Sequence, residues 1–277
     1  MSTLFDLNTK QSSKDSITQA NPSPVILVTG GAKRIGAQII KSAHANGYSV
    51  IVHYHQSQAQ ANELVDVLNS IRANSAAAIQ ASLDIINNPP ALQSFAQQVI
   101  NIFGRLDALV HNASRFYPSP IGQITHSTWN ELFLTNAKAP LMLSQAFLPY
   151  LKDANGCIVS ILDIHANAKP FNRYTVYNMA KSAHQMMVQS LAIELAPNIR
   201  VNGVAPGVNV FPEADSDQAI SKPLQSKIVA SVPLKKEGTP IDIAQTVIFL
   251  LTAKYITGQI IAVDGGRSLT LQGGDAG

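Results

Sequence analysis

Short apolar runs alternate with longer, more polar stretches along most of the chain. The apolar runs lack a clean polar alternation, which is typical of strands that are covered on both faces. The stretches between them, such as 57–73 and 183–196, are typical of helices. We therefore predict strands at 25–30, 48–55, 75–81, 106–113, 156–163, 199–206 and 258–266.

This alternation of strands and helices predicts an α/β fold. We expect one Rossmann-like, doubly wound parallel sheet of about seven strands, with right-handed crossovers and helices on both faces. No internal repeat or linker interrupts the pattern, so residues 24–277 are predicted to form one domain. Residues 1–23 are rich in Ser, Thr, Gln and Asn and lack the apolar middle of a secretory signal, so we interpret them as a flexible tail.

Composition narrows the class of function. Only 13% of the 277 residues are charged and the net charge is +3, which does not favour binding to nucleic acid or to a membrane surface. No apolar run approaches membrane-spanning length. The single cysteine, Cys157, allows no intrachain disulfide, which fits a reducing compartment, and we expect a cytoplasmic protein without a metal site.

The loop after the first predicted strand reads TGGAKRIG, residues 29–36. In open α/β sheets the ligand site lies beyond the carboxyl ends of the strands, where this loop falls. Gly30, Gly31 and Gly36 allow close backbone approach, and the helix that follows directs its N-terminus at the same point. In this context between a strand and a helix, the loop indicates a phosphate-binding turn.

The end of the second strand bears on the choice of dinucleotide. An NAD-binding protein usually places Asp or Glu near this point to hold the ribose hydroxyls, and the segment HYHQS, 53–57, has neither. Cationic groups are expected instead from Lys33, Arg34, His53 and His55, and they favour the extra phosphate of NADP. The alternative is a solvated basic loop.

The strand at 156–163 ends on a carboxylate, Asp163, and is followed by Tyr177 and Lys181. Tyr177 and Lys181 are four residues apart in a predicted helix, so they share one face. An ammonium group beside a phenol favours the phenolate, so we expect Lys181 to lower the pKa of Tyr177 and make it a proton donor near neutral pH.

These segments together resemble the short-chain dehydrogenase/reductase family over nearly the whole chain after the tail. The resemblance rests on TGGAKRIG, HNA after the fourth strand, TNAKAP at 135–140 and the Tyr-x-x-x-Lys pair. The active site of that family consists of an Asn, a Ser, a Tyr and a Lys. The first, third and fourth correspond to Asn136, Tyr177 and Lys181, whereas the serine position is Asp163.

An aspartate at the serine position is similar to the pteridine reductase branch. The chain also resembles bacterial members of this branch in NASRFYPSP (112–120), DIHA (163–166) and APGVNVFPE (205–213). The resemblance implies a homotetrameric NADPH-dependent reductase that transfers hydride to a dihydropterin or dihydrofolate and forms tetrahydrobiopterin or a tetrahydrofolate. Whether fully oxidised pterins are also substrates stays open.

The resemblance also implies roles for individual residues. Asp163 would hold or relay a proton for the pterin ring, Lys181 would hold the nicotinamide ribose, and Asn136 would fix a water in the proton path. A flat pterin would stack on Phe116. The alternatives are a strand-end cap for Asp163 and core packing for Phe116. Implied substrate-binding residues are Ser114, Phe116, Asp163, Tyr177 and Val210. Implied cofactor-binding residues are Gly30, Lys33, Arg34, Ile35, Gly36, His53, Tyr54, His55, Ser57, Ser82, Leu83, Asn112, Ala113, Ser114, Tyr177, Lys181, Pro206, Gly207 and Val208.

The chain departs from this branch at two points. The interval from Asp163 to Tyr177 is one residue longer, which bears on substrate preference. Ser82 stands where the family often has an Asp near the adenine, and Asp84 substitutes only if the strand end shifts. Residues 209–228 form the expected substrate lid, where relatives differ most. Two other functions stay open: a carbonyl reductase of acyl thioesters or sugars, and a catalytically idle NADPH sensor that binds protein.

Overall fold

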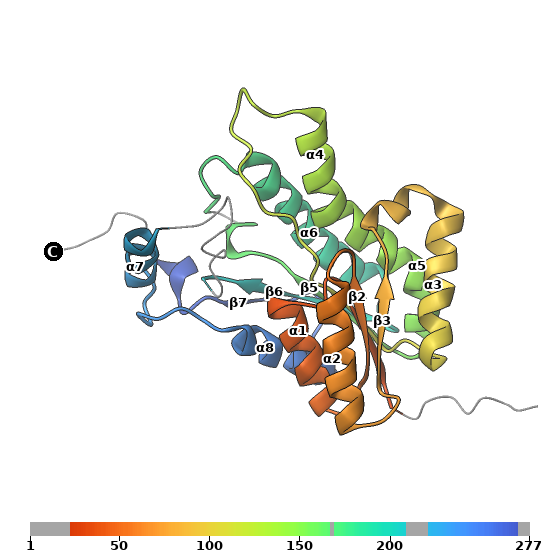
Figure 1. Cartoon of the computed structure of the whole chain (residues 1–277). Coiled ribbons are helices and arrows are strands. Elements are labelled where there is room, and N and C mark those ends of the chain that lie inside the picture. The colour runs from red at the N-terminus through yellow and green to blue at the C-terminus, as the bar shows by residue number, and fades with distance from the viewer. Residues whose placement is uncertain (1–22, 167–168, 209–220, 271–277) are drawn as a thin grey trace, which may run out of the picture.

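The computed structural model describes residues 23–166, 169–208 and 221–270. Its strands form one parallel sheet in the order β3-β2-β1-β4-β5-β6-β7 (Figure 1). The predicted fold class is therefore confirmed, and each strand lies within its predicted range. The strands are β1 Val25–Val28, β2 Ser49–Tyr54, β3 Ala76–Gln80, β4 Ala108–His111, β5 Cys157–Ile161, β6 Arg200–Pro206 and β7 Ile260–Val263.

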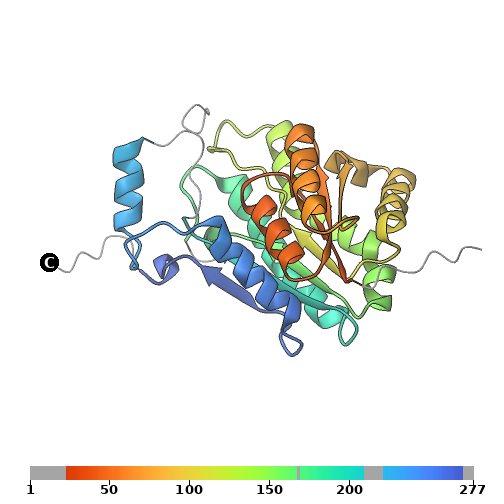
Figure 2. The same cartoon turned by 60° about the horizontal axis from the view of Figure 1, so that its bottom comes forward.

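Helices cover both faces of the sheet (Figures 1 and 2). One face carries α1 Arg34–Ala45, α2 Gln58–Ile71 and α8 Pro240–Thr252. The other carries α3 Pro89–Phe103, α5 Ala139–Asp153 and α6 Thr175–Glu194. The remaining elements are α4 His126–Phe133, α7 Lys222–Ala230, the π-helical turn Leu134–Lys138 and the 3-10 turns Leu83–Asn87, Ile164–Ala166 and Arg267–Leu269.

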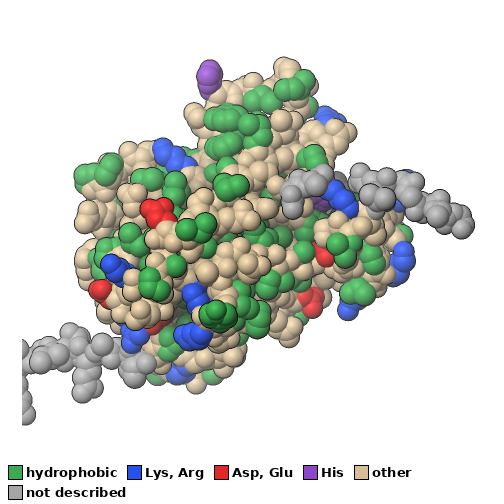
Figure 3. All heavy atoms as spheres, turned by 180° about the vertical axis from the view of Figure 1, so that it is seen from behind, with side chains coloured by type: hydrophobic (Ala, Val, Ile, Leu, Met, Phe, Trp, Pro, Cys, Tyr) green, Lys and Arg blue, Asp and Glu red, His purple; other side chains and the backbone are tan. Residues whose placement is uncertain are grey.

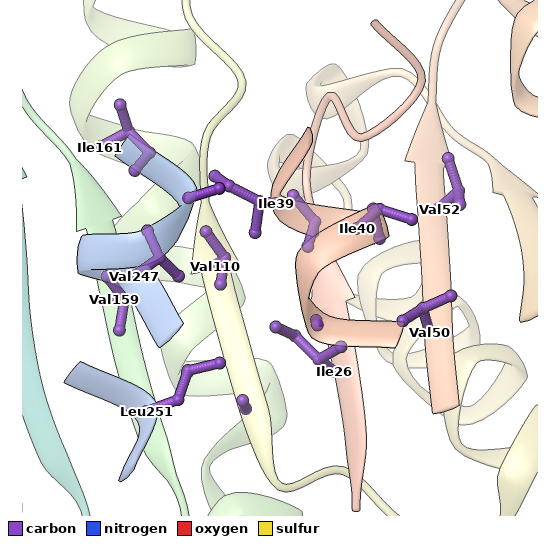
Figure 4. Packing of buried hydrophobic residues seen from close by; sticks show 14 of the residues in the cluster. Ile26, Ile39, Ile40, Val50, Val52, Val110, Val159, Ile161, Val247 and Leu251 are labelled. Atoms are coloured by element: carbon purple, nitrogen blue, oxygen red, sulfur yellow. The ribbon is translucent and has the colours of Figure 1, made fainter. Parts of the chain in front are cut away.

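Alternate residues of each strand enter opposite cores, because successive side chains of a strand point to opposite faces. In β1, Ile26 packs toward α1 and α8, whereas Leu27 packs toward α3 and α5. Figure 4 shows the first of these cores. Its labelled residues come from α1, α8 and the central strands: Ile26, Ile39, Ile40, Val50, Val52, Val110, Val159, Ile161, Val247 and Leu251.

The strand order places the site. Because β1 pairs with both β2 and β4, the chain leaves toward opposite edges of the sheet on the two sides of β1. Such a switch point opens a crevice at the carboxyl ends of the strands. The loops after β1, β2, β4 and β5 all end at this edge of the parallel sheet, so the segments singled out by sequence converge there.

Buried histidines make the stability of the fold sensitive to mild acid. Burial lowers the pKa of His53 to about 4 and that of His111 to about 3, and it places the pKa of His184 well below its ordinary value. In an unfolded chain a histidine titrates near pH 6.5. Below that pH the unfolded state therefore binds protons that the native state does not, and stability falls as pH falls.

We expect the free energy of unfolding to drop between pH 6.5 and 5. The contribution of each of these histidines to the slope rises from about 0.7 kcal/mol per pH unit at pH 6.5 toward about 1.4 kcal/mol per pH unit near pH 5. Urea unfolding at several pH values measures the slope. Replacing His111 with Asn should flatten it, whereas the matched change His126→Asn, at an exposed position, should not. An equal slope in wild type and His111→Asn would contradict this account.

Candidate active site

A cavity of about 720 Å³ lies at the carboxyl ends of the strands. It brings together residues from the loops after β1 to β6 and from α4 and α6. Predicted site residues in its lining are Gly30, Lys33, Arg34, Ile35, Gly36, His53, His55, Ser82, Leu83, Asn112, Ala113, Ser114, Phe116, Asp163, Tyr177, Lys181 and Pro206. Of the other predicted residues, Tyr54, Ser57, Asn136, Gly207 and Val208 do not line it, and Val210 lies outside the described residues.

The glycine loop is shaped for close approach of a ligand. Gly30 has a left-handed φ of +62°. A Cβ on Gly36 would lie 2.2 Å from the carbonyl oxygen of Gly30, so only glycine fits there. The side-chain amide of Asn112 donates to the carbonyls of Thr29 and Gly30, at 2.9 Å each, and ties the loop to the end of β4. The loop therefore fits a phosphate-bearing group at the N-terminus of α1.

His53 has a different role from the one predicted. Its imidazole is buried, its Nδ1 accepts a hydrogen bond of 3.2 Å from the Gly30 amide, and burial lowers its pKa to about 4. The prediction of a cationic His53 is therefore wrong, because burial away from water disfavours the charged form of the imidazole. His53 supports the glycine loop instead. The cations of the glycine loop that line the cavity are Lys33 and Arg34.

The end of β3 supplies both residues that the sequence left open. β3 stops at Gln80, and the following 3-10 turn carries Asp84 to the cavity. The Ser82 hydroxyl accepts from the Asp84 amide at 3.3 Å and donates to the Asp84 carboxylate at 2.9 Å. Asp84 therefore enters the cavity through the turn, without a shift of the strand end.

The carboxylate of Asp163 is used at both oxygens. Its Oδ2 accepts a hydrogen bond of 2.7 Å from the Tyr177 hydroxyl, and its Oδ1 accepts one of 2.8 Å from the His165 amide. The second bond caps the 3-10 turn Ile164–Ala166. Asp163 therefore caps the turn, as one interpretation predicted, and also contacts Tyr177, as the other predicted.

Asp163 controls the proton on Tyr177. Burial, followed by the charge of Asp163 and its hydrogen bond, raises the pKa of Tyr177 well above its ordinary value. The expectation of a pKa lowered by Lys181 is wrong for this structure, since the Lys181 ammonium lies 5.9 Å from the ring centroid while the carboxylate touches the hydroxyl. Tyr177 therefore holds its proton and is a donor.

Lys181 is buried below Tyr177 on the same face of α6. Its ammonium donates to the carbonyl of Ile161 at 3.0 Å. Burial lowers the pKa of Lys181 to about 8, and the charge of Asp163 opposes that shift. The ammonium is thus fixed at the end of β5, between the tyrosine and the sheet.

Asn136 lies in the π-helical turn between α4 and α5, a feature that often marks functional sites. Its side chain is fully buried and saturated. The carbonyl oxygen accepts from the Ser114 hydroxyl at 2.7 Å, and the amide donates to the carbonyls of Arg115 and Leu132 at 2.8 and 3.0 Å. Asn136 therefore fixes the backbone after β4, and its role toward a water in the proton path stays a prediction.

The ring of Phe116 packs against other aromatic residues and also lines the cavity, so it fits both predicted roles, core packing and substrate stacking. It stacks on Tyr174 with ring centroids 4.6 Å apart and meets Tyr177 edge-on at 4.8 Å, so it belongs to an aromatic cluster that also contains Phe171. It also lines the cavity. A flat ring bound over Tyr177 would therefore contact it.

Sequence reasoning missed part of the rim. Arg115 and Glu131 line the cavity and face each other at 3.4 Å, and Leu134 and Thr135 complete that side. Arg115 is adjacent to the predicted Ser114 and Phe116, which was a usable signal. Glu131 follows no strand, and nothing in its surroundings marks it.

The comparisons with known proteins identify the family. The profile described as enoyl-(acyl carrier protein) reductase matches residues 30–268. The chain belongs to the short-chain dehydrogenase/reductase family, and it is an oxidoreductase of that family, whose members use NADH or NADPH. No helix among the described residues is long and apolar enough to cross a membrane.

Individual relatives differ in the substrates that their names state. The chain is 37% identical to pteridine reductase 1 of Leishmania tarentolae, over 92% of this chain and 99% of that protein. It is 32% identical to the 3-oxoacyl-[acyl-carrier-protein] reductase FabG of Staphylococcus aureus, over 87% and 96%. It is 29% identical to granaticin polyketide synthase putative ketoacyl reductase 2 of Streptomyces violaceoruber, over 91% and 99%.

Replacing Tyr177 with Phe should nearly abolish turnover, by about 10²–10⁴-fold, because the hydroxyl is the predicted proton donor. Binding of the reduced cofactor should be unchanged. Oxidation of the cofactor at saturating substrate gives kcat, and a fluorescence titration gives the cofactor affinity. Tyr174→Phe, one turn away in the same aromatic cluster, is the control and should keep its rate. A Tyr177→Phe variant with normal kcat would remove Tyr177 from the chemistry.

Proposed function

We propose that this protein is an NADPH-dependent pteridine reductase, which converts a dihydropterin or dihydrofolate to the tetrahydro form. The observation that carries the proposal is the hydrogen bond of 2.7 Å that Tyr177 donates to Asp163, in a cavity that Phe116 also lines. A ketone needs one neutral donor at its oxygen. A pterin ring nitrogen must gain a proton as hydride arrives at the adjacent carbon, and a tyrosine–carboxylate pair suits that demand.

Each group of residues in the cavity has its own role in the proposed reaction. NADPH, when bound, supplies the hydride, and the glycine loop, Lys33, Arg34 and Lys181 are the residues that would hold it. Tyr177 keeps its proton until the substrate nitrogen takes it. Asp163 accepts the hydrogen bond that orients the hydroxyl and can pair with a protonated ring. Phe116 offers an aromatic face for stacking.

The main alternative is a carbonyl reductase within the same family. The ketoacyl and 3-oxoacyl reductases among the relatives favour it. The carboxylate beside Tyr177 argues against it, because a carbonyl oxygen needs only one neutral donor and has no use for a charged acceptor at that position. The idle NADPH sensor is disfavoured because Tyr177 and Lys181 both line the cavity and Asn136 holds the backbone after β4.

A homotetramer is part of the proposal. Met179, Met186 and Ile193 recur every seven residues on α6, so they share one face, and they are 46%, 60% and 84% exposed. In Figure 3, which shows the molecule from behind, hydrophobic side chains are spread among few charged ones. Burial of such a face against a second copy would remove the apolar surface from water. We also place the protein in the cytoplasm, where the buried thiol of Cys157 stays reduced.

The cofactor preference is tested at Arg34. Arg34→Gln should weaken NADPH binding by about tenfold or more and leave NADH nearly unchanged, since a charge-assisted contact to the 2′-phosphate is worth about 1.5–3 kcal/mol. Glutamine keeps a side chain at a backbone φ of +51°, so backbone strain is matched. Lys41→Gln, exposed on α1 and outside the cavity, is the control. Equal losses for both cofactors would show that Arg34 does not recognise the extra phosphate.

The substrate is tested with Asp163 and a panel of dihydrobiopterin, dihydrofolate, folate and an acetoacetyl thioester. The wild type should reduce the dihydropterins fastest. Asp163→Asn and Asp163→Ser should both lower pterin turnover by about 10²–10⁴-fold with NADPH binding intact.

The two variants distinguish the role of the Asp163 charge in turnover from the role of its hydrogen bond that caps the turn. An asparagine oxygen can still accept from the His165 amide, so Asp163→Asn should keep more of the thermal stability than Asp163→Ser. If Asp163→Asn turns over pterins at the wild-type rate, the carboxylate is only a cap. If the wild type reduces the thioester alone, the pterin assignment fails.

A further inference from the structure

Four polar side chains lie in the core directly behind the catalytic lysine. They are buried, with exposed fractions of 0–3%, and none has a role in the site described above. They come from the elements that carry the active-site residues: His111 ends β4, Ser160 lies in β5, Ser144 in α5, and His184 in α6, one turn after Lys181.

The hydrogen bonds of Ser144 fix the tautomer of His111. The Ser144 hydroxyl donates its one proton to the carbonyl of Pro140 at 2.8 Å. Its oxygen must then accept from His111 Nε2, which lies 2.8 Å away. His111 therefore carries its proton on Nε2, and its Nδ1 is a lone-pair acceptor. That Nδ1 is buried and has no hydrogen-bond partner among the described residues.

His184 also has one ring nitrogen with a serine partner and one without a partner. Its Nε2 lies 2.9 Å from the hydroxyl of Ser160. Its Nδ1 is buried and makes no hydrogen bond of ordinary geometry with any described residue. Burial lowers the pKa of the ring, while the nearby backbone carbonyl of Asn136 raises it by stabilising a ring proton. If Ser160 donates to Nε2, the proton of His184 is on Nδ1. The two rings then offer a complementary donor and acceptor.

The Nδ1 atoms of His111 and His184 do not form a hydrogen bond with each other. Their centroids are 6.0 Å apart and their planes are inclined by 66°. A buried polar atom left without a partner is costly, and proteins commonly fill such a gap with a water that has several polar neighbours. We propose that a buried water bridges His184 Nδ1 and His111 Nδ1 and completes a one-way chain of donors from Ser160 to the carbonyl of Pro140.

The chain would act as a positioning device for Lys181. It links β5 and α6 to β4 and α5, so it fixes the depth at which α6 presents the ammonium to the site. The charged and titratable groups around it are Lys181, whose charge acts directly on His184, then Tyr177 and Asp163 beyond it. Both imidazoles have lowered pKa values because of burial, so both are neutral at pH 7, as the chain requires.

The tautomers are tested first, without substrate. Nitrogen-15 NMR of the histidine rings distinguishes a protonated Nδ1 from a protonated Nε2. We expect His111 to be protonated at Nε2 and His184 at Nδ1, with resonances assigned from His111→Asn and His184→Asn. His111 protonated at Nδ1, or both rings in the same tautomer, would overturn the chain.

The position of the acceptor is tested by two matched variants of His111. Asparagine places an amide oxygen near the position of Nδ1 and loses the contact with Ser144, whereas glutamine reaches Ser144 and loses the acceptor. We expect kcat to stay within about twofold of wild type in His111→Asn and to fall about tenfold or more in His111→Gln, because small misplacement of a catalytic group is expensive. Ser144→Ala is the control for the outer contact and should behave like His111→Asn.

Equal rates in the two variants at matched folded fraction would show that His111 only fills space. Turnover is measured with whichever substrate of the panel the wild type accepts. Failure of the pterin assignment therefore changes the substrate used and leaves this test intact, while the NMR result is independent of any substrate.

Discussion

The active site depends on one hydrogen bond, in which the Tyr177 hydroxyl donates to Asp163. A carboxylate at the end of an apolar strand is expensive unless it is paired, and this bond together with the His165 amide satisfies it. Burial and this bond together raise the pKa of Tyr177 and keep it protonated, and the bond also orients the hydroxyl. Because Asp163 follows β5 and Tyr177 opens α6, the interaction also sets how the first turn of α6 meets the sheet.

The sheet supplies the rigid half of the cavity. The loops after β1 and β4 are joined by the amide of Asn112, and the loop after β1 is supported from below by His53. These contacts are short and local, so the part that fits a dinucleotide is built before any ligand arrives. The other half is assembled from segments that follow β4 and β5, where Phe116 and Asp163 line the cavity and both contact Tyr177.

The sequence predicted the strands well because a strand buried on both faces needs a continuous apolar run, and no other local pattern resembles it. The convergence of the glycine loop, Asp163, Tyr177 and Lys181 followed from the parallel topology. Two electrostatic predictions failed for one reason: spacing shows which groups are neighbours but not how far apart or how dry they are. His53 is neutral because it is buried, and Tyr177 responds to the adjacent carboxylate more than to the ammonium. Glu131 was missed because it joins the rim only through tertiary contact.

The π-helical turn Leu134–Lys138 has a geometric consequence for the helix that contains it. A π turn accommodates one residue more than the regular helix, and each residue of an α-helix turns the chain by about 100°. The wide turn absorbs this extra residue, so the faces of α4 and α5 keep the relative orientation they would have in a regular helix. If the turn closed to α-helical spacing with the extra residue retained, α4 would rotate relative to α5 by about 100°. The wide turn therefore lets one helix keep Glu131 on the cavity side while it holds Asn136 inside the bulge.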